Sequence, residues 1–457
     1  MPDQTTQTIL EEIASALAIS ESSVGKVRFL EAGRLASCFP VTPLAAASIA
    51  AAGLAISDLV AELGSAPLVC VDPRLASLWF GFSIHPQGWE LAASWDDLAG
   101  DYRTSDGWIK LHTNAPHHKA AALNVLGCAA NKAAVVDAVL YRNGTELEEA
   151  IAAAGGCAAT LRSESEWLVH PQGRAIAAEP LVIWNGRSNL PMREWRPSPA
   201  RPLAGLRVLD MTRVLAGPVA TRFLAAYGAQ VLRIDPPEWD EPGVIPEVTL
   251  GKSCARLDLK QPEGRRTFEY LLSQADIFVH GLRGDALERL GLDADVLQAI
   301  RPGLIDISLN AYGHGGPWAS RRGFDSLVQF SSGIAHDGML SHSVSKPWSL
   351  PVQALDQATG YLMAAAAICS VLARFRGEPL TQARLSLART ARLLQQHKDG
   401  LTGTDIRAVN EGDLAQATEQ THWGHARRLK APLSIDGCEM FWDRPAAALG
   451  SAPAQWR

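Results

Sequence analysis

The sequence predicts an α/β protein with a Rossmann-like open parallel sheet domain and a smaller α+β domain. Beyond residue 202, short apolar runs of strand length alternate with helical patterns, which is typical of a parallel sheet covered by helices. Before residue 191, a strand-like run and several helical patterns follow one another without this alternation. The segment 191–202 between the two regions is rich in Pro and Arg, which predicts an extended linker.

The composition is that of a packed globular protein. The chain has 457 residues, of which 47% are hydrophobic and 20% are charged, and this argues against global disorder. Lys and Arg total 42 against 48 Asp and Glu, so no basic surplus supports a nucleic-acid partner. The seven cysteines form no CxxC pair, and we expect reduced structural thiols and no metal site.

Two Ala-rich apolar stretches, 43–59 and 360–373, resemble membrane spans only at first sight. Both are shorter than the roughly 18–20 residues that a span needs, and both are rich in Ala rather than Leu or Ile. Residues 1–12 are polar and acidic, without the apolar core of a secretory signal. We therefore expect buried helices in a cytoplasmic protein without a membrane partner.

The second region gives the clearest order of elements. It predicts strands over 207–211, 230–234, 277–280 and 304–309, with helices over 218–227, 262–274, 285–290 and 295–300. A longer helix over 357–375 follows. We expect the sheet domain to cover residues 203–380 and a carboxyl-terminal return segment to cover 381–457.

The first region predicts a small α+β domain over 86–190 that follows a helical segment over 1–85. A strand over 108–112 comes directly after the turn Ser105-Asp106-Gly107. Helical patterns then follow at 117–126, 132–142 and 145–154.

The order of some elements recurs along the chain. Residues 40–44, an Ala-rich helix and residues 67–71 mirror residues 351–355, a second Ala-rich helix and residues 382–386. Superposing the two helices places Pro43 opposite Asp356. Two explanations stay open, namely a degenerate internal copy and a chance similarity of two Ala-rich helices.

The first strand-to-helix turn of the sheet domain, residues 214–218, lies where an open α/β sheet binds its ligand. It has a single Gly and lacks the GxGxxG fingerprint, and Asp235 is a weak ribose-binding candidate, so a nicotinamide enzyme is disfavoured. Basic residues recur at the starts of elements and fit either a solvated surface or a phosphate site. They are Arg213, Lys252, Arg283 and Arg289.

Asp356 has two readings from its place at the start of a helix. Asp is a favoured N-cap residue, and a helix start also keeps a carboxylate ionised and available as a nucleophile. His112, His117 and His118 lack a carboxylate partner at ligand spacing, so surface or loop histidines are expected rather than a metal cluster.

The second region, beyond residue 202, resembles family III CoA-transferases, the group of formyl-CoA transferase and carnitine CoA-transferase. The run Leu-Ala-Gly-Leu-Arg-Val-Leu-Asp-Met-Thr-Arg-Val-Leu-Ala-Gly-Pro at 203–218 is similar to the family's opening. The similarity continues, in order, at 228–237, 251–260, 286–291, 311–317, 322–325 and the helix that carries Asp356.

The resemblance implies transfer of coenzyme A between an acyl-CoA and a free carboxylic acid. Asp356 matches the aspartate that forms an aspartyl-acyl anhydride and then an aspartyl-CoA thioester, with CoA as substrate and no metal or redox cofactor. The residues that the resemblance places at the CoA site are Arg213, Leu215, Ala216, Lys252, Gly281, Leu282, Arg283, Arg289 and Tyr312.

The chain departs from the family in several places. The stretches 102–111 and 162–167 look like the family's small domain, which here precedes the catalytic part, while 431–437 and 442–445 are similar to its carboxyl-terminal return. We interpret the chain as two fused, trimmed copies of the family's chain. The first copy resembles the end of a degenerate large domain and lacks the nucleophile. The family's interlocked dimers therefore imply either a homodimer or an intramolecular pseudo-dimer.

Two further departures bear on the reaction. Gly281 stands where the family usually has Asn, which leaves a non-catalytic CoA-binding or partner subunit as an alternative. Related racemases carry a histidine directly before the matching Asp325, where this chain has Phe324, which cannot move a proton. A CoA-thioester isomerase or racemase is therefore disfavoured.

Overall fold

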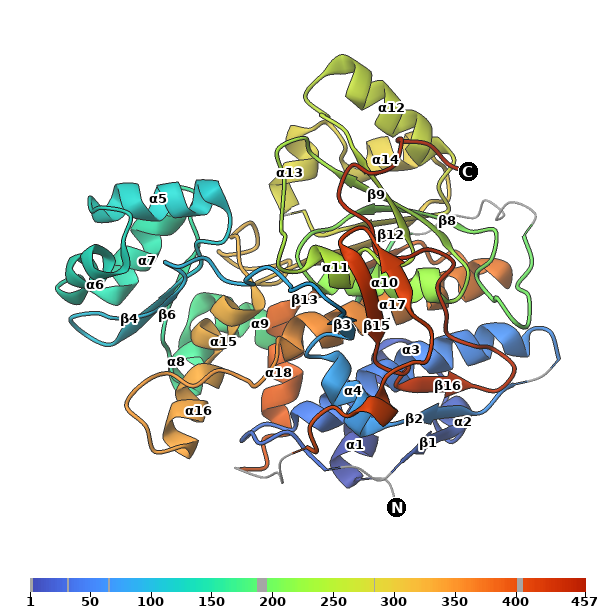
Figure 1. The fold of residues 1–457 in the computed structure, drawn as a ribbon, viewed down its shortest axis with the longest axis horizontal. Helices are drawn as coiled ribbons and strands as arrows, with labels where there is room; N and C mark the ends of the chain where they lie inside the picture. Colours follow the sequence, from blue (N-terminus) through green and yellow to red (C-terminus); the bar gives the residue numbers. More distant parts are fainter. Residues whose placement is uncertain (1–2, 31–32, 65, 187–194, 283, 401–405) are drawn as a thin grey trace.

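A computed structural model describes residues 3–30, 33–64, 66–186, 195–282, 284–400 and 406–457. Its centre is a seven-stranded sheet in which β7 alone is antiparallel to its neighbour (Figure 1). In chain order the six parallel strands are arranged 3-2-1-4-5-6, the doubly wound Rossmann order. The predicted fold class is confirmed. Across the sheet the strands are β10 (Lys252–Arg256), β9 (Gln230–Asp235), β8 (Arg207–Met211), β11 (Ile277–His280), β12 (Ile305–Asn310), β13 (Gln382–Ser386) and β7 (Ile183–Asn185).

Alternate residues of the parallel strands pack into separate cores on the two faces of the sheet. In β8, Val208 joins the core that contains α10 and α17, whereas Leu209 joins the core that contains α12 and α14. Burial on both faces explains why these strands read as continuous apolar runs. The helices around this sheet are α10 (Ala216–Ala226), α11 (Ile245–Val248), α12 (Pro262–Ser273), α13 (Gly284–Arg289), α14 (Ala294–Ile300), α15 (Asp325–Ser332), α16 (Ile334–Ser341), α17 (Ala354–Phe375) and α18 (Leu387–Gln396).

The two Ala-rich stretches form α3 (Val41–Ala61) and α17, which pack against each other in the interior. Both helices are long and apolar enough to span a membrane, but 89% and 83% of their most apolar windows are buried within the protein. Small side chains permit this close packing. A Cβ on Gly360 would lie 2.5 Å from the Ala216 carbonyl oxygen, so glycine is required where α17 meets α10.

The repeated order of elements is visible in the structure. β1 (Val27–Phe29), α3, β2 (Val69–Val71) and α4 (Pro73–Trp79) follow the same course as β12, α17, β13 and α18. Pro43 and Asp356 are both the third residue of their helices. In each unit the antiparallel edge strand comes from the other half of the chain, since β16 (Leu433–Ile435) pairs with β2 and β7 pairs with β13. The two halves therefore interlock.

The small domain contains a three-stranded antiparallel sheet and its own core. Its sheet consists of β4 (Gly100–Arg103), β5 (Trp108–Leu111) and β6 (Ala158–Thr160). The helices α5 (Pro116–Leu126), α6 (Lys132–Leu140) and α7 (Gly144–Ala153) pack on it. They match the order expected from the sequence, and Figure 1 shows this unit projecting to one side of the large sheet.

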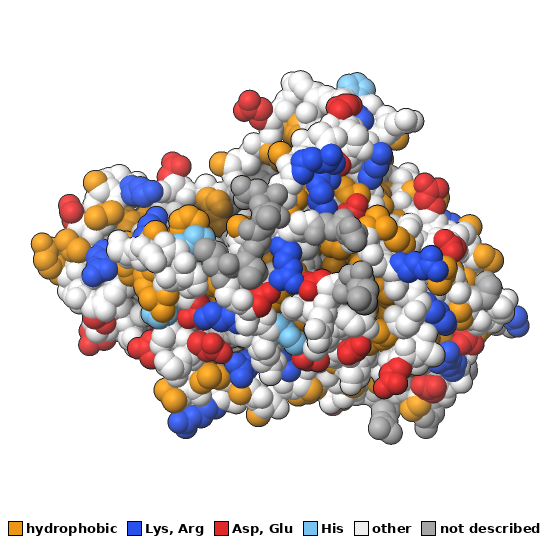
Figure 2. Space-filling model, turned by 90° about the horizontal axis from the view of Figure 1, so that it is seen from below, with side chains coloured by type: hydrophobic (Ala, Val, Ile, Leu, Met, Phe, Trp, Pro, Cys, Tyr) orange, Lys and Arg blue, Asp and Glu red, His pale blue; other side chains and the backbone are white. Residues whose placement is uncertain are grey.

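The remaining elements frame the two units. β3 (Ile84–Pro86), β15 (Gly424–Arg428) and β14 (Glu419–Thr421) form a further antiparallel sheet. The other helices are α1 (Gln4–Ala16), α2 (Glu21–Val24), α8 (Glu164–Val169), α9 (Pro171–Ala178) and the 3-10 turn η1 (Glu411–Asp413). The sequence predicts that the sheet domain ends at residue 380, but the large sheet extends further. β13 is one of its strands, and α18 follows β13. On the face shown in Figure 2, acidic and basic side chains are interspersed.

A buried carboxylate, Glu247 of α11, ties three distant segments together. Its oxygens accept hydrogen bonds from the backbone N–H groups of Ser83 and Ile84, at 3.0 and 3.1 Å. It also forms ion pairs with Arg222 of α10 and with Arg428 of β15, the latter at 2.9 Å. These charged groups are all buried, so each depends on the others for its hydrogen bonds.

Replacing Glu247 by Gln should lower the free energy of unfolding by about 3 kcal/mol, because two buried guanidinium groups lose their counter-charge. Urea unfolding followed by tryptophan fluorescence measures the change. The matched control is Glu263→Gln on the exposed side of α12, which should leave stability nearly unchanged. Equal effects of the two substitutions would contradict a tying role for Glu247.

Candidate active site

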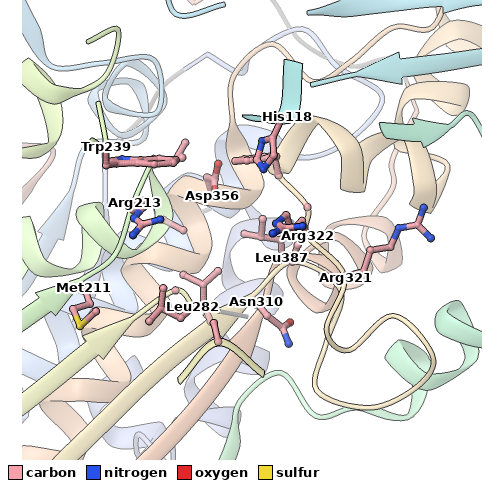
Figure 3. Close-up of a pocket in the computed structure, with 18 of the residues that line it drawn as sticks. His118, Met211, Arg213, Trp239, Leu282, Asn310, Arg321, Arg322, Asp356 and Leu387 are labelled. Atoms are coloured by element: carbon pink, nitrogen blue, oxygen red, sulfur yellow. The ribbon is translucent and has the colours of Figure 1, made fainter. Parts of the chain in front are cut away.

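A cavity of about 290 Å³ opens at the carboxyl ends of β8, β11 and β12 (Figure 3). The order of connections reverses between β8 and β11, and open α/β sheets bind ligands at this switch point. The cavity is lined by His117, His118, Met211, Arg213, Val214, Ala216, Trp239, Gly281, Leu282, Ala286, Leu309, Asn310, Ala311, Arg321, Arg322, Gly323, Phe324, Asp356 and Leu387.

Both halves of the chain contribute to this cavity. His117 and His118 come from α5 of the small domain, whereas Asp356 comes from α17 of the large sheet unit. In the view of Figure 3, Asp356 lies between Trp239 and His118. The small domain of the first half therefore covers the strand ends of the second half.

The cavity places the Asp356 carboxylate against the start of another helix. Asp356 is only 8% exposed, and its carboxylate accepts a hydrogen bond from the backbone N–H of Ala216, the first residue of α10. A Cβ on Gly217 would lie 2.3 Å from the Thr212 side chain, so glycine permits α10 to begin this close to β8. The α10 N-terminus favours the ionised form of the carboxylate.

Asp325 holds the start of α17 in place. Its Oδ2 accepts the backbone N–H of Asp356 at 2.9 Å, it also accepts the N–H of Leu355, and its Oδ1 accepts Gln329 Nε2 at 2.5 Å. Asp356 is the third residue of α17, and the N-cap residue is Gln353. The N-cap interpretation of Asp356 is therefore wrong, and the helix that was expected from 357 begins at Ala354.

The two carboxyl groups influence each other's ionisation. Burial raises the pKa of Asp325 to about 6, although its three hydrogen-bond donors oppose this shift. Burial and then the charge of Asp325 raise the pKa of Asp356 well above its ordinary value, and the Ala216 N–H opposes the shift. Asp325 has more donors, so it carries the charge more readily, and Asp356 is the more basic carboxylate.

His117 is exposed, as the sequence predicts, whereas His112 and His118 are buried. His112 and His118 are 5% and 4% exposed. The ring of His112 stacks on Phe324 at 3.7 Å between centroids, and His118 meets the same ring edge-on at 5.8 Å. Burial lowers the pKa of each to about 3, so both are neutral at pH 7.

The structure brings together five of the residues expected at the site and separates others from it. Arg213, Ala216, Gly281 and Leu282 line the cavity with Asp356. Leu215 and Tyr312 are buried next to lining residues but are not themselves among them. Arg289 is exposed on α13 and is also not among the lining residues, while Arg283 lies outside the described residues.

Lys252 has a structural position that differs from the expected phosphate contact. Its Nζ donates to Asp210 at 3.0 Å, to the Pro218 carbonyl at 2.9 Å and to Thr221 Oγ1 at 2.6 Å. These partners use all three ammonium protons, and the side chain is fully buried. Lys252 therefore holds the start of α10 against β8.

Sequence reasoning missed several lining residues. Trp239 stacks over the Arg213 guanidinium at 4.4 Å, Asn310 ends β12, and Arg322 donates to the Gly155 carbonyl of the small domain at 3.2 Å. The signal for Arg322 and Asp325 was present, because both stand in a motif that carries the family resemblance. Trp239 left no signal, since it lies in an irregular segment.

Fold and site together define a doubly wound α/β protein with a cavity at the switch point of its sheet, lined by a carboxyl group, Asp356, whose pKa is raised. Residues 203–422 match CoA-transferase family III. The chain is 34% identical over 193 residues to the probable fatty acyl-CoA transferase Rv3272 of Mycobacterium tuberculosis, which covers 39% of this chain and 48% of that protein. It is 31% identical over 207 residues to mouse (Mus musculus) succinyl-CoA:glutarate CoA-transferase, which covers 42% and 46%.

The chain thus spans about half the length of these curated relatives. Among solved structures, it matches the orthorhombic crystal form of Rv3272 from M. tuberculosis with 32% identity and a TM-score of 0.41. That match covers 44% of this chain and 58% of the crystallised one.

The raised pKa of Asp356 predicts a pH-dependent stability. A carboxyl group whose folded-state pKa exceeds its unfolded value contributes stability that is present at low pH and is lost as pH rises through the folded pKa. Asp356→Asn removes this loss, so the variant should be more stable than the wild type at pH 8 and nearly equal to it at pH 4. Thermal unfolding at both pH values, with the exposed Asp137→Asn as control, measures the difference. A stability difference that does not change with pH would contradict the assignment.

Proposed function

We propose that the protein transfers coenzyme A between an acyl-CoA and a free carboxylic acid, with Asp356 as the nucleophile. The observation that carries the proposal is a nearly buried carboxylate at the ligand-binding edge of a family III fold. The relatives named above, a probable fatty acyl-CoA transferase and a succinyl-CoA:glutarate CoA-transferase, support the reaction class. CoA enters as a substrate.

The reaction proceeds by exchange at the Asp356 carboxyl group. An Asp356 oxygen attacks the thioester carbonyl carbon, so that a C–O bond forms and the C–S bond breaks. The products are a mixed anhydride on Asp356 and the CoA thiolate. The thiolate then attacks the aspartyl carbonyl, which releases the first acid and leaves an aspartyl-CoA thioester. The incoming carboxylate attacks this thioester and forms a second anhydride. The thiolate attacks its acyl carbonyl, which yields the new acyl-CoA and frees Asp356.

The neighbours of Asp356 suit this role. The charge of Asp325 makes Asp356 a more basic, and hence more nucleophilic, carboxylate than an exposed one. The Ala216 N–H stabilises negative charge on the carboxyl oxygen that it contacts. Phe324, Trp239 and Leu282 give the cavity an apolar wall that limits hydrolysis of the anhydride by water.

A second candidate reaction, isomerisation of a CoA thioester through its α-carbon, is favoured by one observation. His118 lines the same cavity, is neutral at pH 7, and its Nδ1 has no hydrogen-bond partner among the described residues. A neutral imidazole can accept a proton even though Phe324 cannot. Exchange of α-hydrogen for deuterium in D₂O without exchange of CoA would identify this reaction.

Asp356→Asn should lower CoA transfer by about 10³-fold or more, because the covalent route is lost. Incubation with an acyl-CoA followed by hydroxylamine should convert Asp356 to a hydroxamate that mass spectrometry locates. The exposed Asp137→Asn variant should keep both the activity and the adduct. CoA binding without an adduct or turnover would overturn the proposal and favour a non-catalytic CoA-binding subunit.

A further inference from the structure

The Arg213 guanidinium lines the Asp356 cavity and has no hydrogen-bond partner among the residues that the structure describes. Among the described residues its recorded contact is the face of Trp239, at 4.4 Å. Arg213 is half-buried, and this burial lowers the pKa of its guanidinium. A half-buried guanidinium that lines a cavity can bind an anion with planar oxygen geometry.

The two acids with the largest effect on Arg213, Asp235 and Glu241, already accept hydrogen bonds from other groups. Glu241 accepts the N–H of Val214 at 2.9 Å and Arg233 Nη2 at 2.5 Å. Asp235 accepts Arg233 Nε at 2.8 Å. Both acids therefore reduce the electrostatic cost of burying Arg213, but their hydrogen bonds go to Arg233 and to the backbone. The donors of Arg213 remain available to a ligand.

A second unused donor lies beside this guanidinium. Trp239 Nε1 is buried and has no hydrogen-bond partner among the described residues. Trp239 and Arg213 line the same cavity, as Figure 3 shows. A buried indole N–H is normally satisfied, so this one, beside a guanidinium that lines the same cavity, indicates a ligand that brings an oxygen atom to it.

Arg213 and Asp356 lie close enough together for one small ligand to contact both. Ala216 donates to the Asp356 carboxylate and follows Arg213 by three residues, so their Cα atoms are at most about 11 Å apart. An acyl group whose carbonyl carbon lies at Asp356 would therefore place its far end within reach of the guanidinium.

The CoA arm has a different route out of the cavity. Leu282, Leu309 and Asn310 are shared between this cavity and a second one of about 330 Å³. Leu282 follows β11, and Leu309 and Asn310 end β12. These strands lie one and two positions away from β8, which Arg213 follows. A pantetheine arm that leaves in this direction carries the CoA phosphates away from Arg213.

We propose that Arg213, with Trp239, binds the distal carboxylate of a short dicarboxylic acyl group, which makes dicarboxylic acids and their mono-CoA thioesters the substrates. This inference rests on the proposed CoA transfer. In it, Asp356 reacts with one carboxyl group, and Arg213 selects acids that carry a second.

The test compares succinyl-CoA with levulinyl-CoA, in which a methyl ketone of similar size replaces the distal carboxylate. With the wild type, kcat/KM for succinyl-CoA should exceed that for levulinyl-CoA by about 10- to 100-fold, as expected for hydrogen bonds to a charged group. Arg213→Leu should remove this preference by lowering the succinyl-CoA value alone. Arg213→Lys should restore part of it, and the exposed Arg174→Leu on α9 should change neither value.

Two results would overturn the inference. One is equal use of both thioesters by the wild type. The other is an equal loss for both thioesters in Arg213→Leu together with weaker binding of free CoA, which would assign the guanidinium to a CoA phosphate.

A binding measurement separates this inference from the proposed transfer. Free succinate should raise the Tm of the wild type and of Asp356→Asn but not that of Arg213→Leu, and levulinate should raise none of them. If no thioester reacts but succinate binds through Arg213, the transfer fails and the dicarboxylate site stands. If transfer occurs and succinate binding ignores Arg213, the reverse holds.

Discussion

The position of the small domain over the cavity depends on the buried Glu247 carboxylate. Glu247 joins α10, the segment at Ser83 and β15, which come from both halves of the chain. The chain continues from Ser83 through β3 into the small domain, which supplies His118 to the cavity. An uncompensated charge at this depth is costly, so the ion pairs and hydrogen bonds of Glu247 specify one arrangement of the three segments.

A second buried charge, on Asp325, sets the chemistry of the site. Asp325 satisfies the N–H groups at the start of α17 and so fixes the backbone that carries Asp356. The same charge opposes the ionisation of Asp356 and makes it more basic. One side chain thus links the packing of a helix terminus to the ionisation of its neighbour.

The sequence predicted the parts of the molecule that follow from local pattern. The strand–helix alternation and the order of the small domain come from apolar periodicity, which neighbouring residues determine. Arg213 and Asp356 stand in motifs that the sequence singles out, and both line the cavity. The contacts of Lys252 were not predicted, because its partner Asp210 lies 42 residues away in a strand that does not adjoin β10. The burial of His118 and the capping by Asp325 likewise depend on contacts between distant elements, which periodicity does not encode.

The exchange of β7 and β16 between the two halves has a consequence for assembly. Each half completes the sheet of the other, as two subunits of an interlocked pair would, but here a single covalent chain carries both. Tethering replaces the encounter of two molecules by an intramolecular step at a fixed effective concentration. The two sheets are therefore completed within one chain, at a rate that does not depend on protein concentration, and dilution does not separate the two halves.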